Sequence, residues 1–137
     1  KTPHGLAIDR AHMRLFASCG NGVMDVMDAA TGKVLATLPI GVGTDGAAFD
    51  ARRGLAFSSN RDGTLSVIAQ TAPGKFAALA PVETQRGART MALDQASGRI
   101  FLVASDVTQD RTVAPGARGR FKVVPASARL VILQPEQ

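Results

Sequence analysis

Three copies of one sequence pattern fill the chain and limit what it can fold into. Residues 4–9 (HGLAID) return as residues 45–50 (DGAAFD) and again as residues 89–94 (RTMALD). The aspartates that close the copies lie 41 and 44 residues apart, counted from residue 9 to 50 and from 50 to 94. A period of this length indicates a repeat architecture, in which each copy forms one unit of structure.

The same order of elements follows each copy. After a turn comes an apolar strand at 15–19, 55–59 or 100–104, and then an alternating strand at 23–28, 64–69 or 128–133. The first two copies add a fourth strand, at 33–40 and 75–82. Four short strands per period of about 40–45 residues are typical of a β-propeller blade. No stretch sustains the 3.6-residue period of a helical solenoid. We therefore predict an all-β chain of antiparallel blades at about 3–43, 44–87 and 88–135.

The third copy departs from the pattern in two places. An insertion rich in Thr, Pro, Gly and Arg, at about 106–126, separates its second and third strands. After 128–133 no fourth strand follows, so the last blade is predicted to lack its outer strand. Rings close with four to eight blades, so three blades leave open apolar faces and an unpaired edge at 130–133. These features predict a homo-oligomer.

Composition narrows the possible partners. The net charge is +5, but the basic residues form no dense run and no aromatic residues alternate with them, so nucleic acid is not expected as a partner. The single cysteine, Cys19, lies in an apolar strand and is predicted to be buried rather than reactive. No apolar stretch approaches the length of a membrane span, and no signal peptide is visible. The chain starts without Met and looks like a piece of something longer.

Residues at one mouth of the channel are the candidates for ligand binding. His4, Asp45 and Arg89 begin the three innermost strands, and their side chains are suited to an anion, a polar ligand or a hydrated metal. Arg86 and Thr90 flank Arg89, and the loops between second and third strands open on the same face. The predicted ligand-binding residues are His4, Asn21, Asp45, Arg61, Asp62, Arg86, Arg89 and Thr90. For the loop residues, hairpin-turn chemistry is the alternative interpretation.

Other polar residues are predicted to be structural. Asp9, Asp50 and Asp94 each enter a turn, where an aspartate accepts bonds from nearby backbone N–H groups. Ser66 lies in an alternating strand and is predicted to face solvent. The chain carries no Gly-x-Ser-x-Gly, no His-Glu-x-x-His and no phosphate-binding glycine loop. We therefore predict no catalytic residue, no cofactor and no metal site.

The second copy resembles a known bacterial repeat. Its segment FSSN at 57–60, followed by DGTLSVI at 62–68, is similar to the YVTN type of β-propeller repeat, an aromatic-x-Thr-Asn strand followed by a loop and an alternating strand. The first copy matches less closely, with Cys19 in place of Asn, and the third lacks this strand. The resemblance implies a seven-bladed, periplasmic or secreted protein that binds a ligand or another protein. Proteins of similar fold include lactonases and propeller domains of redox enzymes.

Three functions remain open at this point. The first is a non-catalytic scaffold that binds a small molecule or protein at the channel face. The second is a lactonase-like hydrolase, with a metal or activated water held at the channel by residues such as His4 and Asp45. The third is an isolated or engineered propeller fragment that assembles in trans.

Overall fold

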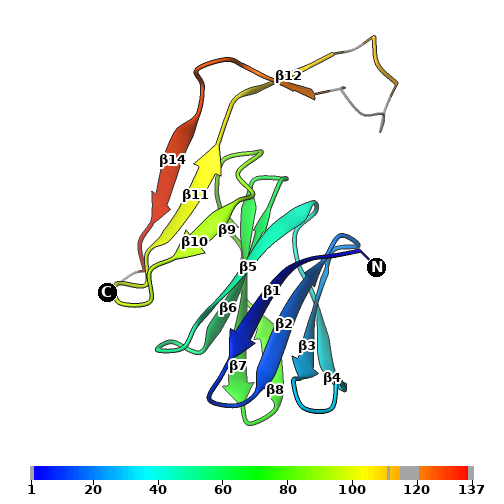
Figure 1. The fold of residues 1–137 in the computed structure, drawn as a ribbon, viewed down its shortest axis with the longest axis vertical. Coiled ribbons are helices and arrows are strands. Elements are labelled where there is room, and N and C mark those ends of the chain that lie inside the picture. The colour runs from blue at the N-terminus through cyan, green and yellow to red at the C-terminus, as the bar shows by residue number, and fades with distance from the viewer. Residues whose placement is uncertain (1, 111, 115–120, 136–137) are drawn as a thin grey trace.

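A computed structural model describes residues 2–110, 112–114 and 121–135 and shows an all-β chain built from antiparallel sheets. The first blade has the order β1-β2-β3-β4 (Figure 1). Its strands are β1 (Pro3–Asp9), β2 (Arg14–Cys19), β3 (Val23–Asp28) and β4 (Val34–Pro39). This is the four-stranded blade that the repeat predicts.

The second blade has the order β5-β6-β7-β8, and an extra short strand pairs with β7. Its strands are β5 (Thr44–Asp50), β6 (Leu55–Asn60), β7 (Thr64–Ala72), β8 (Lys75–Ala78) and β9 (Val82–Glu83). The outer strand predicted at 75–82 is therefore divided in two. Pro81 lies in the break, and a proline has no N–H to donate to a ladder.

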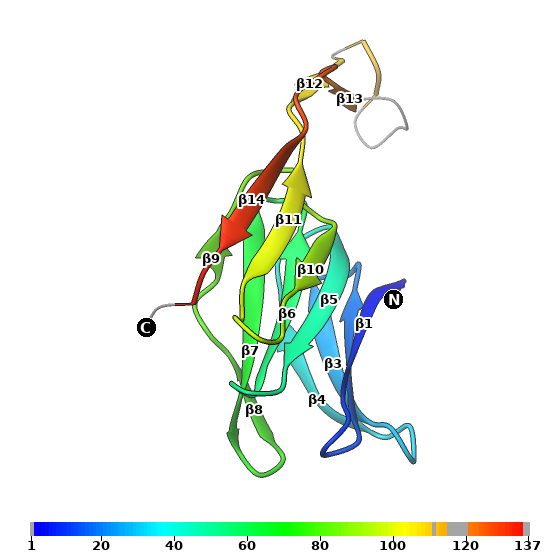
Figure 2. The same ribbon diagram turned by 60° about the vertical axis from the view of Figure 1, so that its left-hand side comes forward.

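The third blade has three strands among the described residues, in the order β10-β11-β14. These are β10 (Met91–Leu93), β11 (Ile100–Ala104) and β14 (Arg129–Leu133). The insertion carries a separate hairpin of β12 (Val107–Gln109) and β13 (Phe121–Val123), which projects beyond the blades (Figures 1 and 2). None of the described residues belongs to a helix that would span a bilayer.

The innermost strands β1, β5 and β10 lie side by side, and glycine permits their close approach. A Cβ atom added at Gly5 would come 2.6 Å from the backbone nitrogen of Ala47. One added at Gly46 would come 2.6 Å from Cγ of Met91. These contacts explain why glycine recurs as the second residue of the first two copies.

Two apolar clusters hold the blades together, one on each face of the second blade. Between the first and second blades lie Phe16, Met24, Val26, Ala56 and Ile68. Between the second and third blades lie Phe57, Leu65, Val67, Ala88, Ile100, Leu102 and Ala104. Successive side chains of a strand point to opposite faces, so β6 and β7 contribute to both clusters. Cys19 is buried, as predicted.

The outward faces of the first and third blades remain apolar and exposed. Leu6 on β1 is 63% exposed, and Leu130 and Ile132 on β14 are 57% and 49% exposed. Among the described residues, β14 pairs with β11 alone. Self-association through these surfaces stays a prediction.

Candidate functional site

The predicted turn aspartates set the geometry of the far ends of the blades. Asp50 accepts hydrogen bonds from the backbone nitrogens of Arg52 and Arg53, at 2.9 and 3.1 Å, and from Nη1 of Arg53 at 2.9 Å. Asp9 and Asp94 accept the equivalent pairs of backbone bonds. Their structural role is confirmed. The predicted ligand-binding residues lie at the opposite ends of the strands.

The three residues at the channel mouth lie in equivalent places on the inner strands. The strand register shifts at His4 and at Asp45, so each occupies a β-bulge, a feature that redirects a side chain. His4 lies against the β2–β3 loop that contains Asn21, since a Cβ added at Gly20 would come 3.0 Å from Nε2 of His4. Asp45 is half-buried and Arg89 is exposed. Within the described residues, no hydrogen bond or ion pair joins these three side chains.

The backbone carbonyls of Arg89 and Thr90 are hydrogen-bonded, the first to the second blade and the second within the third blade. The carbonyl of Arg89 accepts a hydrogen bond from the hydroxyl of Ser59 on the neighbouring blade. The carbonyl of Thr90 accepts one from the backbone nitrogen of Val103, at 3.2 Å. Both side chains are exposed. The backbone at this end of β10 is thus fixed, while the side chains face solvent.

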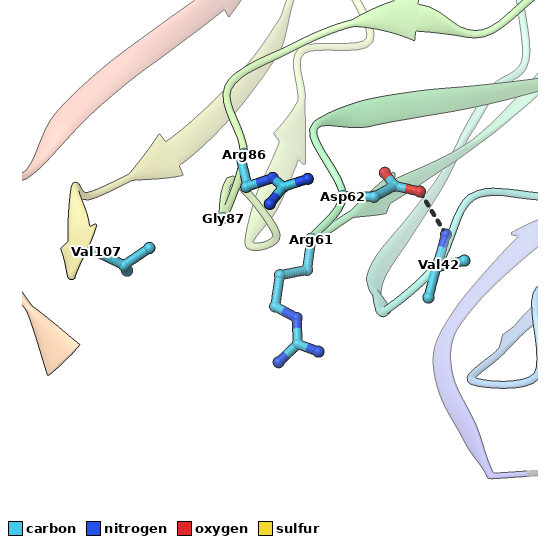
Figure 3. Close-up of a pocket in the computed structure, with 6 residues that line it drawn as sticks. All are labelled: Val42, Arg61, Asp62, Arg86, Gly87 and Val107. Atoms are coloured by element: carbon cyan, nitrogen blue, oxygen red, sulfur yellow. Dashed lines mark hydrogen bonds between the residues drawn. The ribbon is translucent and has the colours of Figure 1, made fainter. Parts of the chain in front are cut away.

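A cavity of about 250 Å³ gathers three of the predicted residues. Its lining consists of Val42, Arg61, Asp62, Arg86, Gly87 and Val107 (Figure 3). These residues come from the link between the first two blades, the β6–β7 loop, the link to the third blade, and the start of β12. In Figure 3, the side chains of Arg61 and Arg86 lie between Val107 on one side and Val42 on the other.

Asp62 braces this cavity. Its Oδ2 accepts a hydrogen bond from the backbone nitrogen of Val42 at 2.6 Å. Its Oδ1 accepts bonds from the nitrogen and the hydroxyl of Thr64, at 3.0 and 2.7 Å. Both carboxylate oxygens are therefore engaged by the protein itself. These bonds are the ones that the turn-chemistry interpretation predicts. Among the described residues, Asp62 forms no ion pair with the neighbouring arginines.

Backbone hydrogen bonds lock the three loops of the cavity together. The nitrogen of Arg61 donates to the carbonyl of Gly43 at 3.1 Å, and the carbonyl of Arg61 accepts from the nitrogen of Gly87 at 2.9 Å. Gly63, at a φ of 97°, lies where an added Cβ would come 3.1 Å from the nitrogen of Arg86. Only glycine combines that backbone conformation with so close an approach. The two arginines therefore project from a fixed frame.

The charge of the cavity is positive. Among the described residues, Arg53 and Arg129 pair with Asp50 and Asp106. Neither Arg61 nor Arg86 has a carboxylate partner in that part of the chain, and both side chains are exposed. Two guanidinium groups beside one engaged carboxylate leave an excess of one positive charge. Such a site attracts anions.

A buried polar network lies beneath the β6–β7 loop and was missed by sequence reasoning. Nδ2 of Asn60 donates to the hydroxyls of Thr64 and Ser66, at 3.0 and 2.9 Å, and its Oδ1 accepts from Ser58 at 3.2 Å. The Ser58 hydroxyl also contacts the Thr44 hydroxyl at 2.6 Å. The prediction that Ser66 faces solvent was wrong. It is 6% exposed because the link between the blades covers it, and its oxygen accepts a bond from the nitrogen of Gly41.

Beside this network lies a second cavity, of about 310 Å³, along the outer part of the second blade. It is lined by Pro39, Ile40, Gly41, Asp62, Thr64, Ser66, Val67, Ala78, Leu79 and Pro81.

In the described ranges, no three side chains of His, Cys, Asp or Glu lie close enough together to hold a metal ion.

Comparison with known proteins identifies the architecture. No protein-family model and no curated protein matches the chain. Among solved structures, hydrazine synthase of Kuenenia stuttgartiensis superposes with a TM-score of 0.65 at 14% identity, over 75% of this chain and 29% of that chain. Sqt1 of Saccharomyces cerevisiae superposes with a TM-score of 0.66 at 10% identity, over 89% of this chain and 34% of that chain. Both have β-propeller-like folds.

The chain has a β-propeller architecture. It spans about a third of each of the two structures. At these identities the likeness concerns the fold alone, so function has to be argued from the site.

Proposed function

We propose that the chain is a non-catalytic β-propeller scaffold, of the YVTN type and periplasmic or secreted, that binds an anionic group between Arg61 and Arg86. One observation carries the proposal. Two guanidinium groups without a carboxylate partner among the described residues line a cavity whose own carboxylate, Asp62, is already held by Val42 and Thr64. The YVTN type and the export rest on the sequence motif at 57–68.

A carboxylate is one anionic group that this cavity suits. A guanidinium presents paired N–H donors in a planar fork that matches the two oxygens of a carboxylate. The exposed apolar side chains of Val42 and Val107 stand on either side of the arginines, where an apolar part of a ligand would cover them. Removing apolar surface from water on binding is favourable. An anion with an apolar part therefore gains more at this site than a bare inorganic ion.

Catalysis gains no support from the same geometry. Among the described residues that line the cavity, Asp62 alone has a side chain that can act as a base, and its oxygens are engaged. The hydrolase alternative depends on His4 and Asp45, which no hydrogen bond joins within the described residues. No further side chain in the described ranges completes a metal-binding group with them. No observation favours this alternative over binding.

Benzoate is a suitable probe, because it combines a carboxylate with an apolar ring. We expect benzoate, added at low ionic strength, to shift the backbone amide signals of Gly63 and Gly87 in nitrogen-15 NMR spectra. Arg61→Ala and Arg86→Ala should each weaken binding about tenfold, since each removes charge-assisted hydrogen bonds. Arg10→Ala, an exposed arginine in the β1–β2 turn at the far end of the blade, is the matched control. Equal affinity in all four proteins would refute the proposal.

A further inference from the structure

The cavity is smaller than a typical ligand pocket and continues into an apolar wall. Its volume of about 250 Å³ lies below the roughly 300–1,000 Å³ usual for small-molecule sites. A cavity of this size encloses one side chain of a larger partner better than a whole ligand. The rest of such a partner would contact the protein surface around the cavity.

The β12–β13 hairpin forms that wall. Val107 lines the cavity and is paired directly across the hairpin with Val123. Residues directly opposite in an antiparallel pair place their side chains on the same face, so Val123 extends the apolar surface of Val107. The two are 41% and 63% exposed, and Val42 on the other side of the cavity is 66% exposed. Apolar surface therefore flanks the arginines on both sides.

The base of the hairpin is held firmly to the third blade. The nitrogen of Val124 donates to the carbonyl of Asp106 at 2.9 Å, and the Asp106 nitrogen donates to the hydroxyl of Ser127 at 3.0 Å. The Asp106 carboxylate pairs with Arg129 and accepts a bond from Gln85, which belongs to the link that carries Arg86. These bonds connect the base of the hairpin to the third blade and to the link that carries Arg86. Figure 1 shows the hairpin extending beyond the blades.

From this arrangement we infer that the partner is an extended acidic segment of another protein, with one carboxylate side chain flanked by aliphatic residues. The inference rests on the proposed anion site between Arg61 and Arg86. The carboxylate occupies that site, and its aliphatic neighbours contact Val42 on one side and Val107 with Val123 on the other. Charge complementarity favours this partner, because neither Arg61 nor Arg86 has a carboxylate partner among the described residues. Lys122, on the other face of the hairpin, is already paired with Asp110.

The test compares a short peptide with a single amino acid on the full chain. The probe is an unlabelled five-residue peptide with blocked termini and a central glutamate flanked by valines, and its binding is measured by isothermal titration calorimetry. Capped glutamate, with its amino and carboxyl groups blocked, is the reference ligand that offers the carboxylate alone. We expect the peptide to bind at least tenfold more tightly than capped glutamate. The same peptide with glutamine in the centre should bind at least tenfold more weakly than the glutamate peptide.

Variants of the wall separate this inference from the anion site itself. Val123→Ser should weaken peptide binding about fivefold and leave benzoate binding unchanged, because Val123 lies outside the cavity lining. Val34→Ser, at a 48% exposed valine on β4, is the matched control. If benzoate binds but the peptide gains nothing over capped glutamate, the site takes free small anions and the inference fails alone. If neither benzoate nor peptide binds, the proposed function fails with it.

Discussion

The three turn aspartates allow a matched test of how burial sets the strength of one motif. Asp9, Asp50 and Asp94 accept the same pair of backbone bonds, but they differ in exposure: Asp50 is 0% exposed, Asp9 is 4% exposed, and Asp94 is exposed. Each aspartate also has one side-chain partner. Nη1 of Arg53 donates to Asp50 at 2.9 Å, Nδ1 of His12 lies 2.7 Å from Asp9, and the Ser97 hydroxyl donates to Asp94 at 2.5 Å. Hydrogen bonds to charged groups contribute about 1.5–3 kcal/mol each, and they do not add fully. We expect Asp50→Ala to cost about 3 kcal/mol of unfolding free energy.

Asp50→Asn keeps an oxygen for the backbone nitrogens but loses the charge, so it should cost about 1 kcal/mol. Asp9→Ala should fall between the Asp50→Ala and Asp94→Ala variants. The measurement is urea unfolding followed by circular dichroism at one protein concentration, since the chain has neither Trp nor Tyr for intrinsic fluorescence. A cost of 3 kcal/mol lowers the urea midpoint by at least about 1 M. Equal losses for Asp50→Ala and Asp94→Ala would refute the argument from burial.

Three further predictions follow from the contacts. Gly5→Ala should destabilise the chain more than Gly46→Ala in urea unfolding. The added Cβ meets backbone atoms at Gly5, whereas at Gly46 it meets the side chain of Met91, which can move. The reverse order of stability would contradict this reasoning. The hydrogen bond from the Ser97 hydroxyl is the largest cause that lowers the pKa of Asp94, and the bond from the backbone nitrogen of Ala96 is the second. The ionised carboxylate therefore stabilises the fold at pH values above its ordinary pKa. This contribution is lost as pH falls through the lowered pKa. Ser97→Ala should raise the pKa of Asp94 in a carbon-13 carboxyl NMR titration, and an unchanged pKa would argue against the hydroxyl as the cause. Light scattering on a sizing column should show a homo-oligomer, whereas a soluble monomer would contradict association through the open faces and the β14 edge.

The blades could be predicted because the repeat fixes both strand order and turn positions. An Asp at the end of the inner strand recurs in all three copies and a Gly near its start in the first two, and the structure shows why. Gly5 lies against the next inner strand, and Asp50 holds its turn through three hydrogen bonds. The division of the outer strand of the second blade was not predicted. The nitrogen of Leu79 still donates to the carbonyl of Val67, and the ladder then stops at Pro81 and resumes at β9. The alternation of apolar and polar residues does not show such a break.

The cavity was only partly predictable. Arg61 and Asp62 were expected near the channel face because of their loop, and Arg86 because it flanks Arg89. The two valines were not expected, because ordinary residues in linkers carry no sequence signal. Their position depends on how the blades pack and on where the insertion leaves the third blade. One feature of the sequence pointed to Val107. The insertion begins beside it, at the same end of the blades as the loop that contains Arg61 and Asp62.

The contrast between the arginines is the strongest reason to regard the cavity as a binding site. Arg53 braces a turn through Asp50, whereas Arg61 and Arg86 project from loops that backbone bonds and Asp62 already hold. Their charges are therefore not needed to shape the loops, and at the exposed surface a lone charge costs little stability. A ligand that meets them does not have to order the backbone around them, so less of its binding energy is lost to entropy. The loops that carry Arg61 and Arg86 are held in place without the arginine charges. This arrangement is the one expected of a preorganised anion site.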